Sequence, residues 1–230
     1  MAQYERRIEF NQPGGGRSLV ITNLLIANAL VFILQLISQE MAGPRQWPLV
    51  DKWFSLMPVV QNTQWQFPPF MPWQLLSYGF LHSSGNYFHI LFNMFILWSF
   101  GKPLAQDFGE RRFLFYYLTC VFGAGLLHLV MPYVGFPAVP VVGASGGVYG
   151  LLLAFGWRYP HTQIMLLIPP IPLKARTAVL LFGGFELVLG LTGTRTGIAH
   201  FAHLGGLLTG VLLLLYWRGK LPLKPKRLLP

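Results

Sequence analysis

Residues 198–217 read IAHFAHLGGLLTGVLLLLYW, a stretch without Asp, Glu, Lys or Arg. A helix of about 20 such residues crosses a hydrocarbon core of roughly 30 Å, so this stretch predicts a membrane-spanning helix. The whole chain has the same character, because 53% of its 230 residues are hydrophobic and only 10% are charged. Soluble domains carry roughly 25% charged residues. The sequence therefore predicts an all-α membrane protein.

Six apolar runs are candidates for membrane spans. Their approximate ranges are 18–38, 86–104, 113–133, 145–158, 174–192 and 198–217. The fourth run is short for a complete crossing, so its helix is expected to begin beneath the membrane surface, below the uncharged segment 132–143. This organisation predicts an N-terminal cytoplasmic segment at 1–17, a six-transmembrane-helix bundle at 18–217 and a basic cytoplasmic tail at 218–230.

The basic residues indicate the orientation of these spans. Fourteen Lys and Arg fall on one side, and only Arg45, Lys52 and Arg195 fall on the other. The fourteen are Arg6, Arg7, Arg17, Lys102, Arg111, Arg112, Arg158, Lys174, Arg176, Arg218, Lys220, Lys224, Lys226 and Arg227. Because cytoplasmic loops retain Lys and Arg, both termini are predicted to be cytoplasmic. The expected location is a cell membrane, either an inner or a plasma membrane, which the chain crosses several times.

The charge distribution and the cysteine content limit the possible partners and cross-links of the chain. The net charge of +10 is divided among short loops, whereas a nucleic-acid-binding surface needs its basic residues gathered together. We therefore expect contact with membrane lipid and no nucleic-acid partner. The single cysteine, Cys120, excludes an intramolecular disulfide.

A long segment at 39–85 separates the first two spans on the outer side. It carries Trp47, Trp53, Trp65 and Trp73 among prolines. Tryptophan is enriched at the headgroup level, where its apolar ring and its polar N–H are both accommodated. The segment is therefore predicted to be an interfacial loop rather than a disordered one.

Several polar side chains are expected at one depth within the bilayer. Ser145 opens the fourth run and His203 lies about five residues into the sixth, and both runs descend from the outer face. His89 and Asn93 are four apart, and so on one helical face, in the upper half of the second run. Tyr149 lies one turn after Ser145 and is placed to stack on the His203 imidazole. A membrane serine alone is usually a packing residue, but a shared depth for all these groups favours a site.

Small residues offer a way to bring two of these helices together. Gly146 and Gly150 are four apart in the fourth run, and Ala202, Gly206 and Gly210 repeat that spacing in the sixth. Small residues at this interval let membrane helices approach closely, so these two faces are predicted to pair. The motif alone is chiefly a packing signal.

These residues resemble the rhomboid family of intramembrane serine proteases over nearly the whole chain. The matching motifs are GASG at 143–146, AHLGG at 202–206 with Gly210, HILFN at 89–93, and Trp73-Gln74 in the outer loop. Two positions depart from the family's pattern, because Gln74 replaces an Arg and Ala105 occupies a site that often carries Glu. The resemblance implies a rhomboid-like bundle and proteolysis within the membrane.

The resemblance also implies roles for the polar residues. Ser145 is expected to be the nucleophile and His203 its general base, acting as a dyad with Tyr149 orienting the imidazole. His89, Asn93 and the backbone N–H of Ser145 are expected to stabilise the oxyanion.

The residues around this dyad predict a sharp turn of the backbone before the helix and no bound cofactor. Gly143 and Gly146 flank the serine and allow a sharp turn into the helix. Glu186 is the only acid within the predicted spans, and we weigh it as a third member of the site or, with more weight, as a packing or surface group. Neither a cofactor nor a metal is expected, because no carboxylate or thiolate is expected beside His89 and His203.

The expected substrate is a transmembrane segment of another protein, cut near its outer end. The family implies lateral access between the second and fifth spans, with residues 192–197 as a movable cap. Two rival functions remain: a non-catalytic rhomboid-like protein that binds transmembrane helices, and a transporter. A transporter is disfavoured because the sequence has no convincing internal repeat.

Overall fold

The computed structural model describes residues 18–43, 46–60, 67–165, 170–192 and 199–222. The predicted segments 1–17 and 193–197, and most of the tail 218–230, therefore lie outside the described residues. The main helices are α1 (Leu19–Met41), α4 (Tyr87–Phe108), α5 (Glu110–Val130), α6 (Ser145–Arg158), α7 (Ala175–Leu191) and α8 (His200–Trp217). The short elements are α2 (Leu49–Phe54), α3 (Gln74–Ser77), the 3-10 turns η1 (Tyr78–Phe80) and η2 (Met131–Val134), and the strands β1 (Gln163–Met165) and β2 (Pro172–Lys174).

One long helix lies on each of the six predicted runs. The clearest difference is at the end of α4, which passes Pro103 and continues to Phe108, beyond the expected end at 104. Buried Leu104, Ala105 and Phe108 hold this last turn against the core, and tertiary packing of that kind outweighs the break that a proline favours. Gly109 then takes a φ of 79°, which allows the abrupt turn into α5.

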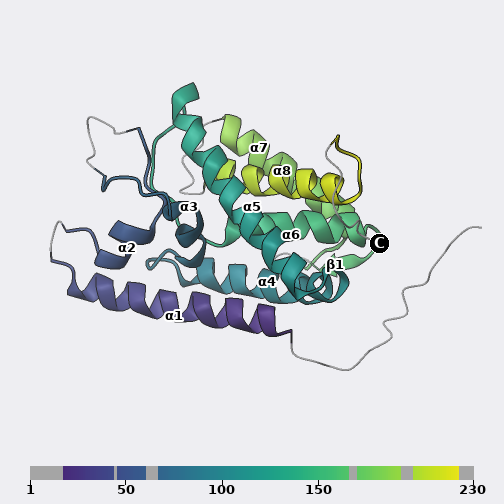
Figure 1. Cartoon of the computed structure of the whole chain (residues 1–230), viewed down its shortest axis with the longest axis horizontal. Coiled ribbons are helices and arrows are strands. Elements are labelled where there is room, and N and C mark those ends of the chain that lie inside the picture. The colour runs from purple at the N-terminus through teal and green to yellow at the C-terminus, as the bar shows by residue number, and fades with distance from the viewer. Residues whose placement is uncertain (1–17, 44–45, 61–66, 166–169, 193–198, 223–230) are drawn as a thin grey trace, which may run out of the picture.

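Five of the six long helices meet at one end of the molecule. The Glu110 carboxylate at the start of α5 accepts the backbone N–H of Leu19 at 2.8 Å, which caps the start of α1. Arg158 at the end of α6 reaches Asp107 near the end of α4, with Nη2 3.0 Å from Oδ1. Phe108 and Trp217 pack edge to face at 5.9 Å, which adds the end of α8. The chain therefore reverses direction from each long helix to the next (Figure 1).

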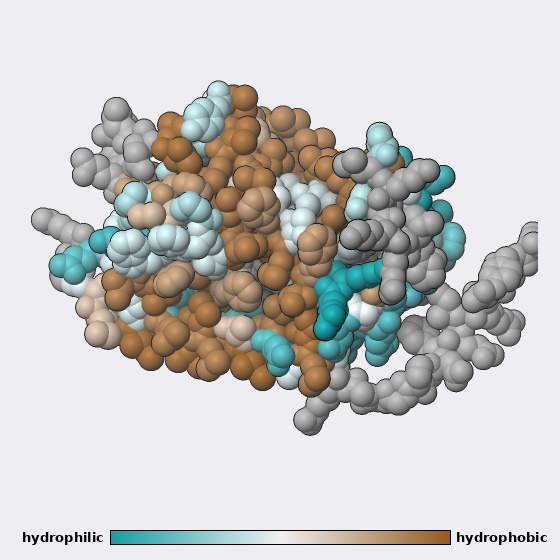
Figure 2. Space-filling view, viewed as in Figure 1, coloured by the Kyte–Doolittle hydropathy of each residue, from teal (hydrophilic) through white to brown (hydrophobic). Residues whose placement is uncertain are grey.

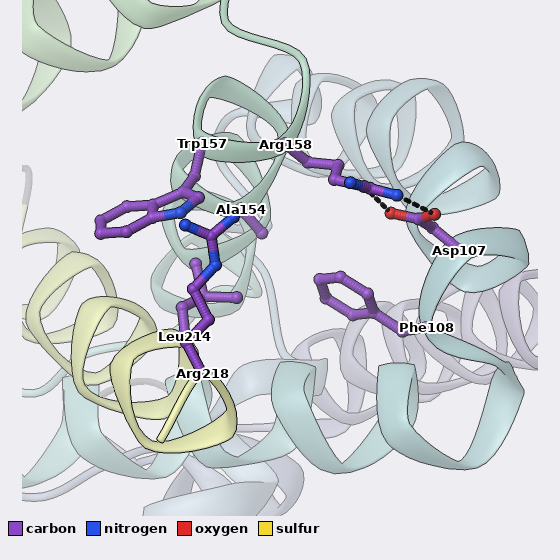
Figure 3. A pocket seen from close by; sticks show the side chains of 7 residues that line it. All are labelled: Asp107, Phe108, Ala154, Trp157, Arg158, Leu214 and Arg218. Carbon is purple, nitrogen blue, oxygen red and sulfur yellow. Dashed lines mark hydrogen bonds and ion pairs between the residues drawn. The ribbon is translucent and has the colours of Figure 1, made fainter. Parts of the chain in front are cut away.

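A small cavity of about 20 Å³ lies among these helix ends. Figure 3 shows Arg158 pointing across to Asp107 on one side, while Trp157 lies under the Arg218 guanidinium on the other. A volume of that size holds about one water molecule. The cluster fastens α4, α6 and α8 together and is too small for a substrate.

Helix α6 is the central element of the bundle. It packs against α4, α5, α7 and α8, and ten of its fourteen residues are buried. At 1.5 Å per residue its length is about 21 Å, shorter than the hydrocarbon core of about 30 Å. Helix α6, with 14 residues, is also shorter than each of these neighbours, which have 17 to 22.

The surface of the bundle is suited to lipid. Large apolar side chains such as Leu30, Leu91 and Leu180 are more than half exposed, and Figure 2 shows hydrophobic residues over most of one face. Hydrophilic residues gather toward the ends of the molecule, most densely at the right of the picture. Three described helical stretches are long and apolar enough to cross a membrane: α1, Glu110–Val134 and α8. The protein is thus a mostly helical membrane protein, and its described strands are the antiparallel pair β1 and β2.

The described parts of the segment between α1 and α4, which include α2 and α3, are folded back onto the bundle at the left of Figure 1. Buried Gln74 accepts the backbone N–H groups of Met57 and Met71 through Oε1, at 3.1 and 3.2 Å, and donates to the carbonyl of Trp53 at 3.3 Å. The Trp73 ring N–H donates to the same carbonyl at 2.9 Å. Gln74, the residue that departs from the family's Arg, is thus an organising centre of this segment.

Candidate active site

Ser145 and His203 are in hydrogen-bonding contact. Ser145 is the first residue of α6, and His203 lies one turn inside α8. The serine Oγ is 2.8 Å from Nε2 of the imidazole. His203 is buried and Ser145 is half-buried. The structure therefore brings together a hydroxyl and an imidazole that are 58 residues apart in the chain.

Glycines make this contact possible. A Cβ placed on Gly206 would lie 1.9 Å from the carbonyl oxygen of Gly146, so the two helix backbones touch. A Cβ on Gly150 would lie 3.5 Å from the carbonyl oxygen of Gly206 on the same face. Gly210 faces the Tyr116 hydroxyl of α5, which donates to the carbonyl of Gly150 at 2.8 Å. The predicted small residues therefore lie at the interfaces of α6 with α8 and of α8 with α5.

Tyr149 lies flat on the imidazole. The two rings have centroids 4.3 Å apart and planes 11° apart, and the tyrosine hydroxyl donates to Oε1 of Glu186 at 2.5 Å. Tyr149 therefore restrains the plane of the His203 ring and also contacts an acid on α7.

Glu186 is buried beside the imidazole rather than on the surface. Only 5% of it is exposed, and its Oε1 lies 2.9 Å from Nδ1 of His203. The two atoms are close, but their geometry is not that of an aligned hydrogen bond. Oε2 lies 2.5 Å from Nδ1 of His200. Burial excludes the surface role that we considered for Glu186 from the sequence, and it is compatible with the packing role.

The predicted oxyanion residues lie in and near the site. The His89 ring faces Gly143, where a Cβ would lie 2.8 Å from its Nε2 and 3.5 Å from Oγ of Ser145. Its Nδ1 accepts the backbone N–H of Ser83 at 3.2 Å, which leaves Nε2 as the nitrogen toward the serine. Asn93 is buried, and its amide donates to the carbonyl of His89 at 2.7 Å. In this state His89 faces the site directly, and Asn93 is bound to its own helix.

The backbone before Ser145 takes a form that only glycine adopts readily. Gly143 has a φ of 134°, and its N–H donates to the carbonyl of Tyr78 at 3.0 Å. Helix α6 begins two residues later, and the first N–H groups of a helix have no intrahelical acceptor. These groups carry the positive end of the helix dipole. The start of α6 is therefore suited to hold a negative oxygen next to Oγ of Ser145.

Sequence reasoning missed the part that His200 takes. The residue lies three positions before His203, and an i, i+3 spacing places both rings on one face of α8. That spacing was the available signal. No group of three or more His, Cys, Asp or Glu suited to a metal occurs among the described residues.

The arrangement has the parts that acyl transfer requires. A hydroxyl contacts a base, the base contacts an orienting ring and a carboxylate, and helix N–H groups face the same point.

Comparison with known proteins identifies the family. The Rhomboid domain matches residues 69–220, which include Ser145, His203, His89 and Glu186. The chain belongs to the rhomboid family. This match covers α3 through α8 and the packed core around α6.

Several rhomboid proteins are similar to this chain. Rhomboid protein 1, mitochondrial, of Saccharomyces cerevisiae is 33% identical over 136 residues, covering 58% of this chain and 39% of that protein. Presenilin-associated rhomboid-like protein, mitochondrial, of Homo sapiens is 29% identical over 146 residues, covering 59% and 37%. RHOMBOID-like protein 4 of Arabidopsis thaliana is 33% identical over 147 residues, covering 61% and 33%. The chain spans less than two fifths of the length of these relatives.

The names of the relatives correct one expectation. From the sequence, the expected location was an inner or plasma membrane of the cell. The yeast and human relatives are both mitochondrial, so the comparisons point to a mitochondrial membrane instead. Charge in the loops reports which side of a bilayer a loop occupies, and it carries no information on which bilayer that is.

Proposed function

We propose that this chain is an intramembrane serine endopeptidase that cuts transmembrane segments of other membrane proteins near their outer end. The single observation that carries the proposal is the 2.8 Å contact between Oγ of Ser145 and Nε2 of His203. Membership in the rhomboid family supports the same reaction class.

The proposed reaction proceeds through an acyl-enzyme. Oγ of Ser145 attacks the scissile carbonyl carbon while its proton passes to Nε2 of His203. The carbonyl oxygen becomes an oxyanion near the His89 ring and the start of α6, where N–H donors stabilise it by about 3 kcal/mol each. The C–N bond then breaks and the leaving amine takes the proton from Nε2. Water next attacks the ester, gives a proton to Nε2, and Ser145 recovers its proton as the C–O bond breaks.

The proposed topology places this chemistry within reach of water. In our proposal all six long helices cross the bilayer, both termini lie on the side with most Lys and Arg, and the short α6 sets Ser145 beneath the opposite surface. The polar groups of Ser145, His203 and His89 are proposed to attract the water that hydrolysis needs.

The substrate is proposed to reach the site from the lipid. Apolar side chains of α4 line a hollow of about 460 Å³. Tyr87, Phe88 and Leu91 are exposed there, and Ile90 and Met94 are half-buried. His89 lies within this stretch of α4, so a helix docked there would end next to the site. Because each peptide group of an intact helix is hydrogen-bonded and shielded, the cleaved segment must unwind, and Gly or Pro in the substrate helps.

A fluorophosphonate probe tests the proposed nucleophile. The unchanged protein should be labelled at Ser145, and His203→Ala should lose labelling while keeping its thermal unfolding temperature. A non-catalytic rhomboid-like protein that only binds transmembrane helices would show no His203-dependent labelling. That result would replace the protease with the binding protein.

A further inference from the structure

The buried carboxylate of Glu186 has two hydrogen-bond partners, a close contact with Nδ1 of His203, and no neutralising Lys or Arg in contact with it among the described residues. Its contacts come from two other helices: the Tyr149 hydroxyl of α6 at 2.5 Å, Nδ1 of His200 at 2.5 Å and Nδ1 of His203 at 2.9 Å. An ionised carboxylate is stable when buried only if it is paired and hydrogen-bonded. These contacts can stabilise an ionised Glu186 carboxylate next to His203, the proposed general base.

We propose that Glu186 is a positioning residue that completes a Ser145–His203–Glu186 relay. The proposal rests on the proposed protease function and extends it from two residues to three. Glu186 acts through His203 and does not touch the substrate.

The geometry gives Glu186 a specific task. A neutral imidazole carries its proton on one nitrogen only, and a carboxylate beside Nδ1 favours the form with the proton there. Nε2 then has its lone pair free, and Nε2 is the nitrogen that lies 2.8 Å from Oγ of Ser145. When His203 takes the serine proton it becomes a cation, which the adjacent carboxylate stabilises.

Tyr149 and His200 hold the carboxylate in place for this task. Tyr149 donates to Oε1, the same oxygen that faces His203, and His200 fixes Oε2. The aromatic stack of Tyr149 on His203 restrains the ring plane, while Glu186 selects its tautomer. Orientation and tautomer are therefore set by different residues.

The pH dependence of turnover distinguishes positioning from a purely structural role. The titratable groups that face His203 among the described residues are Glu186 from α7, Tyr149 from α6 and His89 from α4, with His200 one turn back on α8. Of these, Glu186 supplies the negative charge. An adjacent opposite charge shifts a titration by about one pH unit or more. Removing it should therefore move the acid limb of the pH–rate profile.

The test uses Glu186→Gln, Glu186→Asp and the control Val188→Ala in the full chain in liposomes, with a fluorogenic transmembrane peptide as substrate. Glu186→Gln removes the charge and can present an amide N–H to Nδ1, which favours the wrong tautomer. We expect kcat to fall at least about tenfold, KM to stay within about threefold, and the acid limb to move about one pH unit lower. Glu186→Asp should restore the limb and part of kcat. Exposed Val188→Ala should match the unchanged chain.

Several outcomes would overturn the inference. One is a Glu186→Gln variant whose pH profile and kcat are both unchanged. Another is a variant whose pH profile is unchanged while its kcat and its unfolding temperature fall together. If this variant does not fold, 15N NMR of the unchanged protein with labelled histidine tests the inference instead. The relay requires that neutral His203 carry its proton on Nδ1. A proton on Nε2 would refute the relay. The variants Ser145→Ala and His203→Ala are measured in the same cleavage assay. If both keep full turnover, the protease proposal fails; if both are inactive while Glu186→Gln is unaltered, only the relay fails.

Discussion

Gly206 of α8 is in contact with the backbone of Gly146 in α6. There is no room for a side chain between them, because a Cβ on Gly206 would lie 1.9 Å from the Gly146 carbonyl oxygen. His203 is one turn before Gly206, and Ser145 is the residue before Gly146. The separation of the two helices therefore sets the separation of the two reacting side chains.

Gly206→Ala should push α8 away from α6 and break the contact between Ser145 and His203. We expect at least a tenfold loss of turnover and a destabilisation of about 1–3 kcal/mol from overpacking. Thermal unfolding in detergent and cleavage of a transmembrane peptide measure the two effects. Gly184→Ala on α7 is the matched control, because a Cβ there meets nothing within 4 Å. Equal behaviour of the two variants would contradict the role given to this contact.

Gln74→Ala should loosen the outer segment. The change leaves the buried backbone N–H of Met57 without its acceptor, and a buried unpaired donor costs about 1–3 kcal/mol. Chemical unfolding in detergent should show a loss of that size. Gln106→Ala on the exposed side of α4 is the control and should change stability by less than about 0.5 kcal/mol. A Gln74→Ala protein as stable as the control would show that these hydrogen bonds contribute nothing.

His82 should make the fold sensitive to acid. It lies in the loop before α4, its ring nitrogens have no partner among the described residues, and burial lowers its pKa to about 3. The unfolded chain binds a proton below about pH 6.5. Stability is therefore fully present above that pH and falls between it and about pH 3, by up to about 1.4 kcal/mol per pH unit.

His82→Phe removes this titration, so its free energy of unfolding should fall less steeply than that of the unchanged chain between pH 6.5 and pH 4. Chemical unfolding at a series of pH values measures both slopes. His161→Phe, on an exposed loop, should leave the slope as it is. Parallel curves for His82→Phe and the unchanged chain would rule out His82 as the acid-sensitive group.

Leu91→Trp should obstruct the hollow on α4. Leu91 is 61% exposed and lines the proposed docking surface. We expect KM for a transmembrane peptide to rise several-fold, about 1 kcal/mol of lost binding, with the fluorophosphonate labelling rate of Ser145 unaltered. Leu34→Trp on exposed α1 serves as the control. A normal KM in Leu91→Trp would move the docking surface elsewhere.

The positions of the long helices could be predicted from the sequence, because membrane-spanning helices are long runs of apolar residues. The run at 145–158 matches α6 at both ends, whereas the depth of Ser145 below the membrane surface stays a prediction. The spacing of Ser145, His203 and His89 along their runs was enough to predict a common depth. Depth follows from the rise per residue, and that calculation needs no tertiary information.

Lateral contacts were less accessible. Depth along α7 does not say which way Glu186 faces, so its contact with His203 was weighed below a packing role. The end of α4 was missed for a similar reason, because the burial of Phe108 depends on Trp217 from the far end of the chain. Rotation about a helix axis is fixed by its neighbours, which one sequence alone does not place.

The most direct test of the central claim is cleavage of a single-span protein in liposomes by the unchanged chain and by Ser145→Ala. The unchanged chain should release two fragments cut near the outer end of the span, and Ser145→Ala should release none while unfolding at the same temperature. Equal cleavage by both proteins would contradict the claim that the Ser145 hydroxyl, activated by His203, performs the chemistry.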